Sequence, residues 1–260
     1  MRNYVIASLA LLLILLGLLT LTLRDRPPTL PSTAPLYFKI ESLEQISTNN
    51  NLSVPGYAAA SGMQGAWGVL HVSEIATGTV VLANKSIGQG PTIVYADDGP
   101  GGMTGQITGI FYGLQTNSAN TSTGGTIDLF WHATNATYVE SNCVSGTTCS
   151  PDAAAVALFT SGTFLVRLKL ANGVQPENEM TFTLSTGPWS SDTFSQSAFA
   201  NVDTSMSGPW TAAMDADWFS TNFGTRDVRL MIVGARQSTW SGTSPAVGVK
   251  GADPITVFTH

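Results

Sequence analysis

Three histidines and a few paired acidic residues are the side chains of this sequence best suited to catalysis or metal binding. The histidines are His71, His132 and His260, and they lie far apart along the chain. A zinc site or a nucleophile–base pair requires such groups to converge in space, and the sequence has neither a His-Glu-x-x-His nor a Gly-x-Ser-x-Gly motif. We therefore expect ordinary surface or hydrogen-bonded histidines, and we predict no catalytic residue, no metal ligand and no cofactor.

Two acidic pairs lie in segments typical of loops. Asp97 and Asp98 precede Gly-Pro-Gly-Gly, and Asp215 and Asp217 lie between two tryptophans. Adjacent carboxylates on a glycine-rich turn could supply oxygen ligands to Ca²⁺, although the alternating ligand positions of an EF-hand are missing. The simpler interpretation, which we favour, is a solvated turn. Paired acids also serve glycoside hydrolysis, but the separation of two carboxylates cannot be read from sequence.

The cysteines and the asparagine triplets could indicate whether the domain lies in an oxidising, exported compartment. Cys143 and Cys149 bracket a short polar loop, which predicts a small disulfide in an oxidising compartment; two free thiols are the alternative. Asn-x-Ser/Thr triplets would be glycan acceptors in an exported chain. In a chain this rich in Asn, Ser and Thr, chance triplets are the favoured explanation. The triplets begin at Asn51, Asn84, Asn120 and Asn135.

Aromatic residues gather in the C-terminal half, in polar surroundings rich in Gly and Ser. Such residues can be protein-interface anchors or sugar platforms, and they can equally be lids over a core. We expect an interface, with Trp210, Trp218 and Phe219 as its candidate residues.

The elements around these residues begin with an apolar run over residues 4–23. A helix of that length spans about 30 Å, the thickness of the hydrocarbon core of a bilayer. Arg2, Arg24 and Arg26 flank it, and no small-x-small cleavage site follows, although a removed signal peptide is the alternative. We predict an uncleaved, single-pass N-terminal anchor over residues 1–26, with the rest of the chain on the periplasmic or extracellular side.

The remainder divides into a spacer and one large domain. Residues 27–35 contain four prolines, which favours a semi-rigid extended stalk. Short alternating or β-branched segments then predict about nine strands and a short helix near residues 151–158. Residues 209–219 could be a short helix or an apolar loop that caps one end of the sheets. The expected fold of residues 36–260 is all-β, a β-sandwich or jelly-roll. The predicted strands cover residues 36–43, 67–75, 79–82, 106–114, 125–131, 163–170, 180–184, 227–233 and 255–258.

Composition narrows the class of partner. Charged residues make up 11% of the 260 residues, and the net charge is −6. The few basic residues form no run, which argues against nucleic-acid binding, because such binding needs a basic surface. An apolar fraction of 43% argues against disorder.

Four strand-like segments carry a family resemblance. These are residues 67–69, 105–113, 125–130 and 251–255, and they resemble the exported domains of bacterial PEP-CTERM surface proteins. The resemblance implies an all-β extracytoplasmic domain of unassigned biochemical role. The chain departs from that family at its C-terminus, where the Pro-Glu-Pro sorting segment is missing.

Together these features predict a non-enzymatic, membrane-anchored accessory or structural subunit. Its partners would be the lipid bilayer and a larger membrane or envelope assembly on which the β-domain docks. The alternatives are a surface adhesin, pilus-like or matrix protein, and a carbohydrate-binding domain. A small-molecule ligand is not expected.

Overall fold

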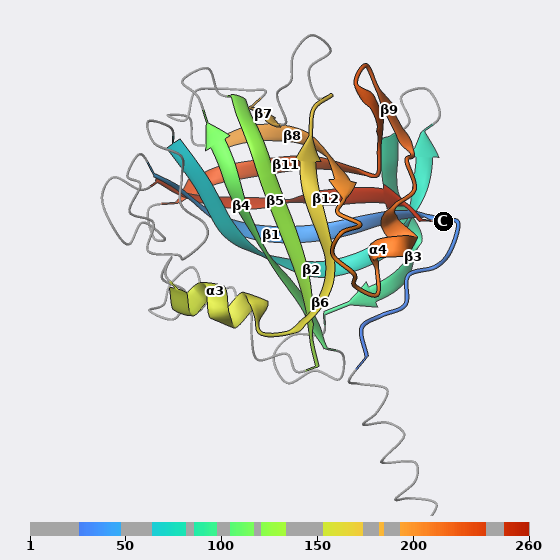
Figure 1. Cartoon of the computed structure of the whole chain (residues 1–260). Helices are drawn as coiled ribbons and strands as arrows, with labels where there is room; N and C mark the ends of the chain where they lie inside the picture. The colour runs from blue at the N-terminus through green and yellow to red at the C-terminus, as the bar shows by residue number, and fades with distance from the viewer. Residues whose placement is uncertain are drawn as a thin grey trace, which may run out of the picture.

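The computed structural model describes residues 26–47, 64–81, 86–97, 105–116, 121–133, 153–173, 182–184, 193–237 and 247–259. These residues form an all-β domain with two short helices, so the predicted all-β class is confirmed. Figure 1 shows most of the strands wrapped into a curved wall, with α3 outside it, α4 at its end and the β9–β10 hairpin as a separate small sheet. The strands are β1 (Pro35–Ser47), β2 (Gln64–Val81), β3 (Ser86–Ala96), β4 (Gln106–Thr116), β5 (Thr121–His132), β6 (Thr163–Ala171), β7 (Phe182–Leu184), β8 (Thr193–Val202), β9 (Phe219–Thr221), β10 (Gly224–Arg226), β11 (Val228–Gln237) and β12 (Val247–Phe258); the helices are α3 (Ala153–Thr160) and α4 (Thr211–Met214).

The main sheet closes on itself, which corrects the predicted sandwich. Its strands follow the order β1-β12-β11-β8-β6-β5-β4-β2, and β1 pairs with β2 as well as with β12. Eight antiparallel strands therefore form a closed barrel, in which each strand pairs with a neighbour on both sides. A sandwich would have two separate sheets facing each other, and the pairing of β1 with β2 rules that out.

Alternation along each strand fills the interior. In β1, Leu36 and Phe38 are fully buried, whereas Tyr37 and Lys39, which alternate with them, are half-buried on the outer wall. Their register partners continue the same layer, because Leu36 lies opposite Val257 and Phe38 opposite Ile255. The interior is therefore a packed apolar core whose members come from all eight strands of the ring.

Strand β2 is long enough to serve two neighbours along one edge. Its first part pairs with β4, from Gln64 to Val72, and its second part pairs with β3, from Glu74 to Val81. Strand β3 thus lies outside the ring of eight, and the backbone N–H of Asp97 still donates to Ser73 O at 2.9 Å just beyond its end. Strands β3 and β4 therefore pair with successive parts of the same edge of β2.

One end of the barrel is covered by two segments distant in sequence. Trp210 and Met214, from the segment around α4, are buried in the interior cluster, and Trp210 packs edge-to-face on Phe38 with ring centroids 5.9 Å apart. Residues 27–34 lie against the same end: Leu30 is buried, and Pro28 O accepts a hydrogen bond from Trp210 Nε1 at 2.9 Å. The segment predicted as a stalk therefore packs on the domain, and we call it the N-terminal strap.

The membrane predictions require a second correction. Among the residues described, no helix is long and apolar enough to cross a membrane. This finding contradicts the predicted transmembrane part of the fold class and the predicted single-pass location, and we do not retain them. The apolar run over residues 4–23 itself lies outside the described residues, as do Cys143 and Cys149 of the predicted disulfide.

Candidate functional site

A polar cluster on the outer wall brings together residues from three strands. His71 on β2 lies 2.6 Å from a carboxylate oxygen of Asp97, measured from Nε2 to Oδ2. Gln106, at the start of β4, donates from Nε2 to the same oxygen at 2.9 Å. The side chains of His71 and Asp97 are 7% and 5% exposed, so Asp97 is not the solvated turn residue that the sequence suggested.

The second half of this cluster is centred on a hydroxyl. Thr108 lies opposite His71 in the β2–β4 register, and its Oγ1 is 2.7 Å from Nε2 of His132. The same hydroxyl donates to the backbone oxygen of Phe159 in α3 at 2.7 Å, so it accepts from a protonated Nε2. Burial lowers the pKa of His132, and a hydrogen bond with the Phe159 backbone partly opposes that shift. A neutral His132 with its proton on Nε2 fits both contacts.

The cluster has the components of nucleophilic catalysis but not their arrangement. A catalytic hydroxyl gives its proton to the imidazole and faces the substrate. Thr108 instead gives its proton to a backbone carbonyl, and it is fully buried. Its contacts hold α3 against the wall of β2, β4 and β5, where Figure 1 shows the helix lying outside the barrel. We therefore interpret this cluster as structural.

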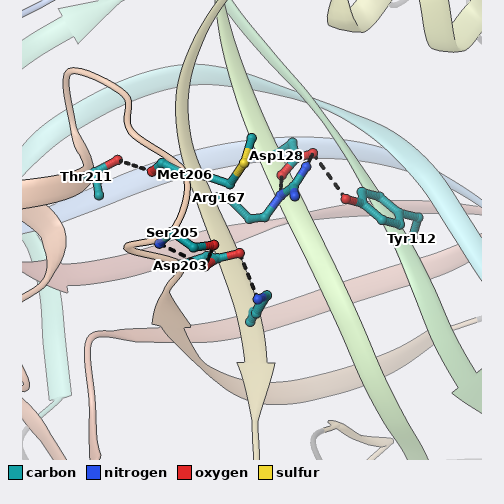
Figure 2. Close-up of polar contacts among 8 residues, drawn as sticks. Tyr112, Asp128, Arg167, Asp203, Ser205, Met206 and Thr211 are labelled. Atoms are coloured by element: carbon teal, nitrogen blue, oxygen red, sulfur yellow. Dashed lines mark hydrogen bonds and ion pairs between the residues drawn. The ribbon is translucent and has the colours of Figure 1, made fainter.

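A second polar network crosses β4, β5 and β6. Arg167 donates from Nε and Nη2 to the two carboxylate oxygens of Asp128, each at 2.7 Å, and Tyr112 donates its hydroxyl to Asp128 at 3.2 Å. Figure 2 shows the three side chains converging from neighbouring strands. The hydrogen bonds to Asp128 raise the pKa of Arg167, and the bidentate geometry satisfies both oxygens of a nearly buried carboxylate.

The same face continues to a turn after β8. Lys169 Nζ lies 2.8 Å from Oδ2 of Asp203, and the Ser205 hydroxyl donates to Oδ1 of Asp203 at 2.6 Å (Figure 2). These two contacts, the lysine first, lower the pKa of Asp203 to about 2. Thr211 closes the turn by donating to Met206 O at 3.1 Å. Each charge in this network has a partner within the protein.

A third group combines half-buried aromatic side chains with one arginine and one exposed methionine. It lies on the outer wall over β8, β11 and β12, and we call it the Arg229 patch. The Arg229 guanidinium carbon lies 5.9 Å from the ring centroid of Phe199, its register partner. The rings of Trp218 and Phe258 are stacked 4.1 Å apart, and the Met231 side chain is 46% exposed. The patch consists of Phe199, Trp218, Arg229, Met231 and Phe258.

Two of the three predicted interface residues are buried within the domain. Trp210 is 1% and Phe219 is 2% exposed, and Phe219 packs against Phe199 with centroids 6.0 Å apart. Their positions favour the core alternative that the sequence left open. Trp218 is only half-buried and belongs to the Arg229 patch. Arg229 and Met231 were not singled out from the sequence; the alternation of residues 227–233, which puts both on one face of the strand, is the signal that could have found them.

Of the second acidic pair, Asp215 is exposed, whereas Asp217 makes hydrogen bonds within the domain. Asp217 has a φ of 50° and accepts the Thr225 hydroxyl at 2.7 Å, while its N–H donates to Asp227 at 2.7 Å. Asp227 is 2% exposed, and burial raises its pKa although two backbone N–H groups oppose that shift. No group of three His, Cys, Asp or Glu able to hold a metal occurs within the described ranges. Several predicted positions lie outside those ranges: Asp98, His260 and the asparagines Asn51, Asn84, Asn120 and Asn135.

Comparison with known proteins identifies no relative: no family model, no curated protein sequence and no solved structure matches this chain.

Proposed function

We propose that this chain is a non-enzymatic accessory subunit that docks on a larger protein assembly through the Arg229 patch. The observation that carries the proposal is the exposure of Met231, 46%, beside half-buried Arg229, Phe199 and Phe258 on one face. Aromatic residues, Met and Arg are the types enriched at the cores of protein interfaces, whereas Lys and Glu are depleted there.

Packing and electrostatics elsewhere favour this proposal over catalysis. The interior is filled by side chains, and the histidine-containing cluster is buried beneath α3 with its hydroxyl proton directed at a carbonyl. Asp128 and Asp203 are each paired with a cation and supply no free base. Pairing of this kind stabilises a wall, whereas a catalytic pair has to face a substrate.

The test compares two matched substitutions in the full chain. Met231→Asp places a charge in the Arg229 patch, and Ile93→Asp does the same on β3, where Ile93 is 58% exposed outside the patch. Tagged chains are purified from the cells that produce the protein, and the co-purifying subunits are identified and mapped by cross-linking mass spectrometry. We expect cross-links at the patch that persist in Ile93→Asp and disappear in Met231→Asp.

Equal co-purification and cross-linking in both variants would overturn the proposal, provided that thermal unfolding shows both to be folded. A turnover activity of the purified chain would overturn its non-enzymatic part.

A further inference from the structure

We infer that the partner presents a carboxylate, from Asp or Glu, to the guanidinium of Arg229 and surrounds it with apolar side chains. This inference rests on the proposed function and specifies the chemistry of the partner. It starts from the position of Arg229, which lies over the ring of Phe199 at 5.9 Å and is half-buried on β11.

Three other cations of the described outer wall are each paired with a carboxylate. Lys39 lies 3.0 Å from Glu74, Arg167 lies 2.7 Å from Asp128, and Lys169 lies 2.8 Å from Asp203. Arg229 differs from all three, because within the described part of the chain no carboxylate lies within 4.0 Å of its side chain. The patch therefore holds an uncompensated positive charge in apolar surroundings.

Docking would remove water from this guanidinium. A charge buried without a partner strongly opposes association, whereas a hydrogen-bonded opposite charge compensates it. The planar fork of arginine matches a carboxylate in a bidentate pair, and Arg167 shows that geometry on the same wall. The aromatic rings and Met231 lie beside Arg229, so we expect the partner to have apolar side chains next to its carboxylate.

A second copy of this chain fits the patch less well. In a twofold dimer the same patch meets itself, so the two Arg229 side chains would approach each other at the interface. Like charges brought together in this way oppose association. A distinct acidic partner segment is therefore the occupant that the charges favour.

The experiment uses the full chain and a random peptide library displayed on phage. Against the wild type we expect enrichment of peptides with Asp or Glu beside aromatic or aliphatic residues. Arg229→Glu should shift the enrichment to peptides with Lys or Arg. Lys169→Gln removes one positive charge from the same wall and should leave the acidic preference unchanged.

Affinity measurements on the best peptide complete a double-mutant cycle. Replacing its acidic residue by the amide should weaken binding to the wild type by about 10–100-fold, the usual range for a charged hydrogen bond. On Arg229→Gln the acidic and amide peptides should bind equally.

Two results would overturn the inference in distinguishable ways. In the first, peptides bind and Met231→Asp abolishes their binding, but the wild type shows no preference for acidic peptides, or Arg229→Gln retains that preference. The inferred carboxylate of the partner is then wrong, while the proposed docking patch stands. If no peptide binds, or if Met231→Asp and Ile93→Asp bind alike, the docking patch fails as well.

Discussion

Asp227 and Asp203 are both nearly buried carboxylates, yet their pKa values move in opposite directions. For Asp227 burial dominates and raises the pKa, although its carboxylate accepts the backbone N–H groups of Val202 and Asp217. For Asp203 the contacts with Lys169 and Ser205 dominate and lower it. Both carboxylates accept hydrogen bonds from their own chain, so each of them contributes to holding the fold together.

The two backbone N–H groups on Asp227 make its removal costly. In Asp227→Ala both donors lose their acceptor at the junction of β8 and the β9–β10 hairpin, which predicts a loss of about 2–4 kcal/mol in the free energy of unfolding. Urea denaturation measures this change. Asp215→Ala, at an exposed position, should stay within about 0.5 kcal/mol of the wild type. Similar losses in the two variants would contradict this role of Asp227.

The lowered pKa of Asp203 predicts that the free energy of unfolding depends on pH in the acid range. Because its folded pKa of about 2 lies below the ordinary 3.8, its contribution to stability is complete above pH 3.8 and is lost as the pH falls toward 2. That contribution is about 1 kcal/mol, since Lys169 is largely exposed and its pairing is screened by solvent. The free energy of unfolding of Asp203→Asn should therefore fall less steeply across this window than that of the wild type. An unchanged slope would show that the pair contributes nothing.

At the scale of elements, α3 depends on one hydroxyl on the wall beneath it. Trp67, Val69, Ile110 and Phe159 are fully buried but do not belong to the interior cluster. They indicate a second apolar layer outside the barrel, on the side where α3 packs against β2 and β4. Within this layer Thr108 satisfies both Phe159 O and His132 Nε2.

Removing that hydroxyl should loosen the helix. Thr108→Val removes the hydrogen bonds of the hydroxyl with the Phe159 carbonyl and the His132 imidazole, which should cost about 1–3 kcal/mol in the free energy of unfolding. Hydrogen–deuterium exchange over α3 should become faster, whereas Thr108→Ser keeps the hydroxyl and should exchange as the wild type does. Equal exchange in the valine and serine variants would show that α3 is held by apolar packing alone.

The sequence located most strands and failed where the hydrophobic pattern was weak. Strands β4, β5, β6 and β11 alternate clearly, and each overlaps its predicted segment. Strand β8 was missed because Ala198 and Ala200, small residues with little apolar contrast, supply its buried face. Strand β3 was missed because Gly88, Gly90 and Pro91 interrupt it, as is typical of strands outside a sheet's centre.

Strand β12, in the middle of the sheet, was predicted only in part, again because its sequence pattern is interrupted. Pro254 has no N–H for the ladder, and the pairing of β11 with β12 is interrupted between Leu230↔Ile255 and Val233↔Ala252, with the same register on both sides. Only residues 255–258, after this interruption, were predicted. Met231 lies beside the gap in the ladder, so the irregular strand forms part of the wall under the Arg229 patch.

At the scale of the molecule, closure depends on pairings between distant residues, which local patterns do not encode. The same alternating strands can form a sandwich or a barrel, and the pairing of β1 with both β2 and β12 decides between them. The polar cluster is equally non-local: His71, Asp97 and His132 come together only through the register of β2, β3, β4 and β5. From the sequence these residues seemed dispersed because the register could not be read.

Trp210 connects the parts of the chain that close one end of the barrel. Its ring packs on Phe38 of β1, its indole N–H donates to Pro28 O of the N-terminal strap, and its own N–H donates to Leu165 O at 3.2 Å. Thr259 ties the strap to the other terminus by donating to Pro31 O at 2.6 Å. Trp210 therefore joins the strap, β1 and β6 into one cooperative unit.

Its truncation should destabilise the whole domain. Trp210→Ala leaves a cavity in the interior cluster and an unsatisfied carbonyl at Pro28, and we expect a loss of about 3–5 kcal/mol in the free energy of unfolding. Trp218→Ala is the matched control, because Trp218 stacks on Phe258 outside the interior and is only half-buried, so its loss should be clearly smaller. Denaturant unfolding followed by circular dichroism measures both. If the two variants lose equal stability, Trp210 does not hold the end of the barrel closed. If only Trp210→Ala is destabilised and Trp218→Ala instead loses partner binding, Trp210 belongs to the core and Trp218 to the interface.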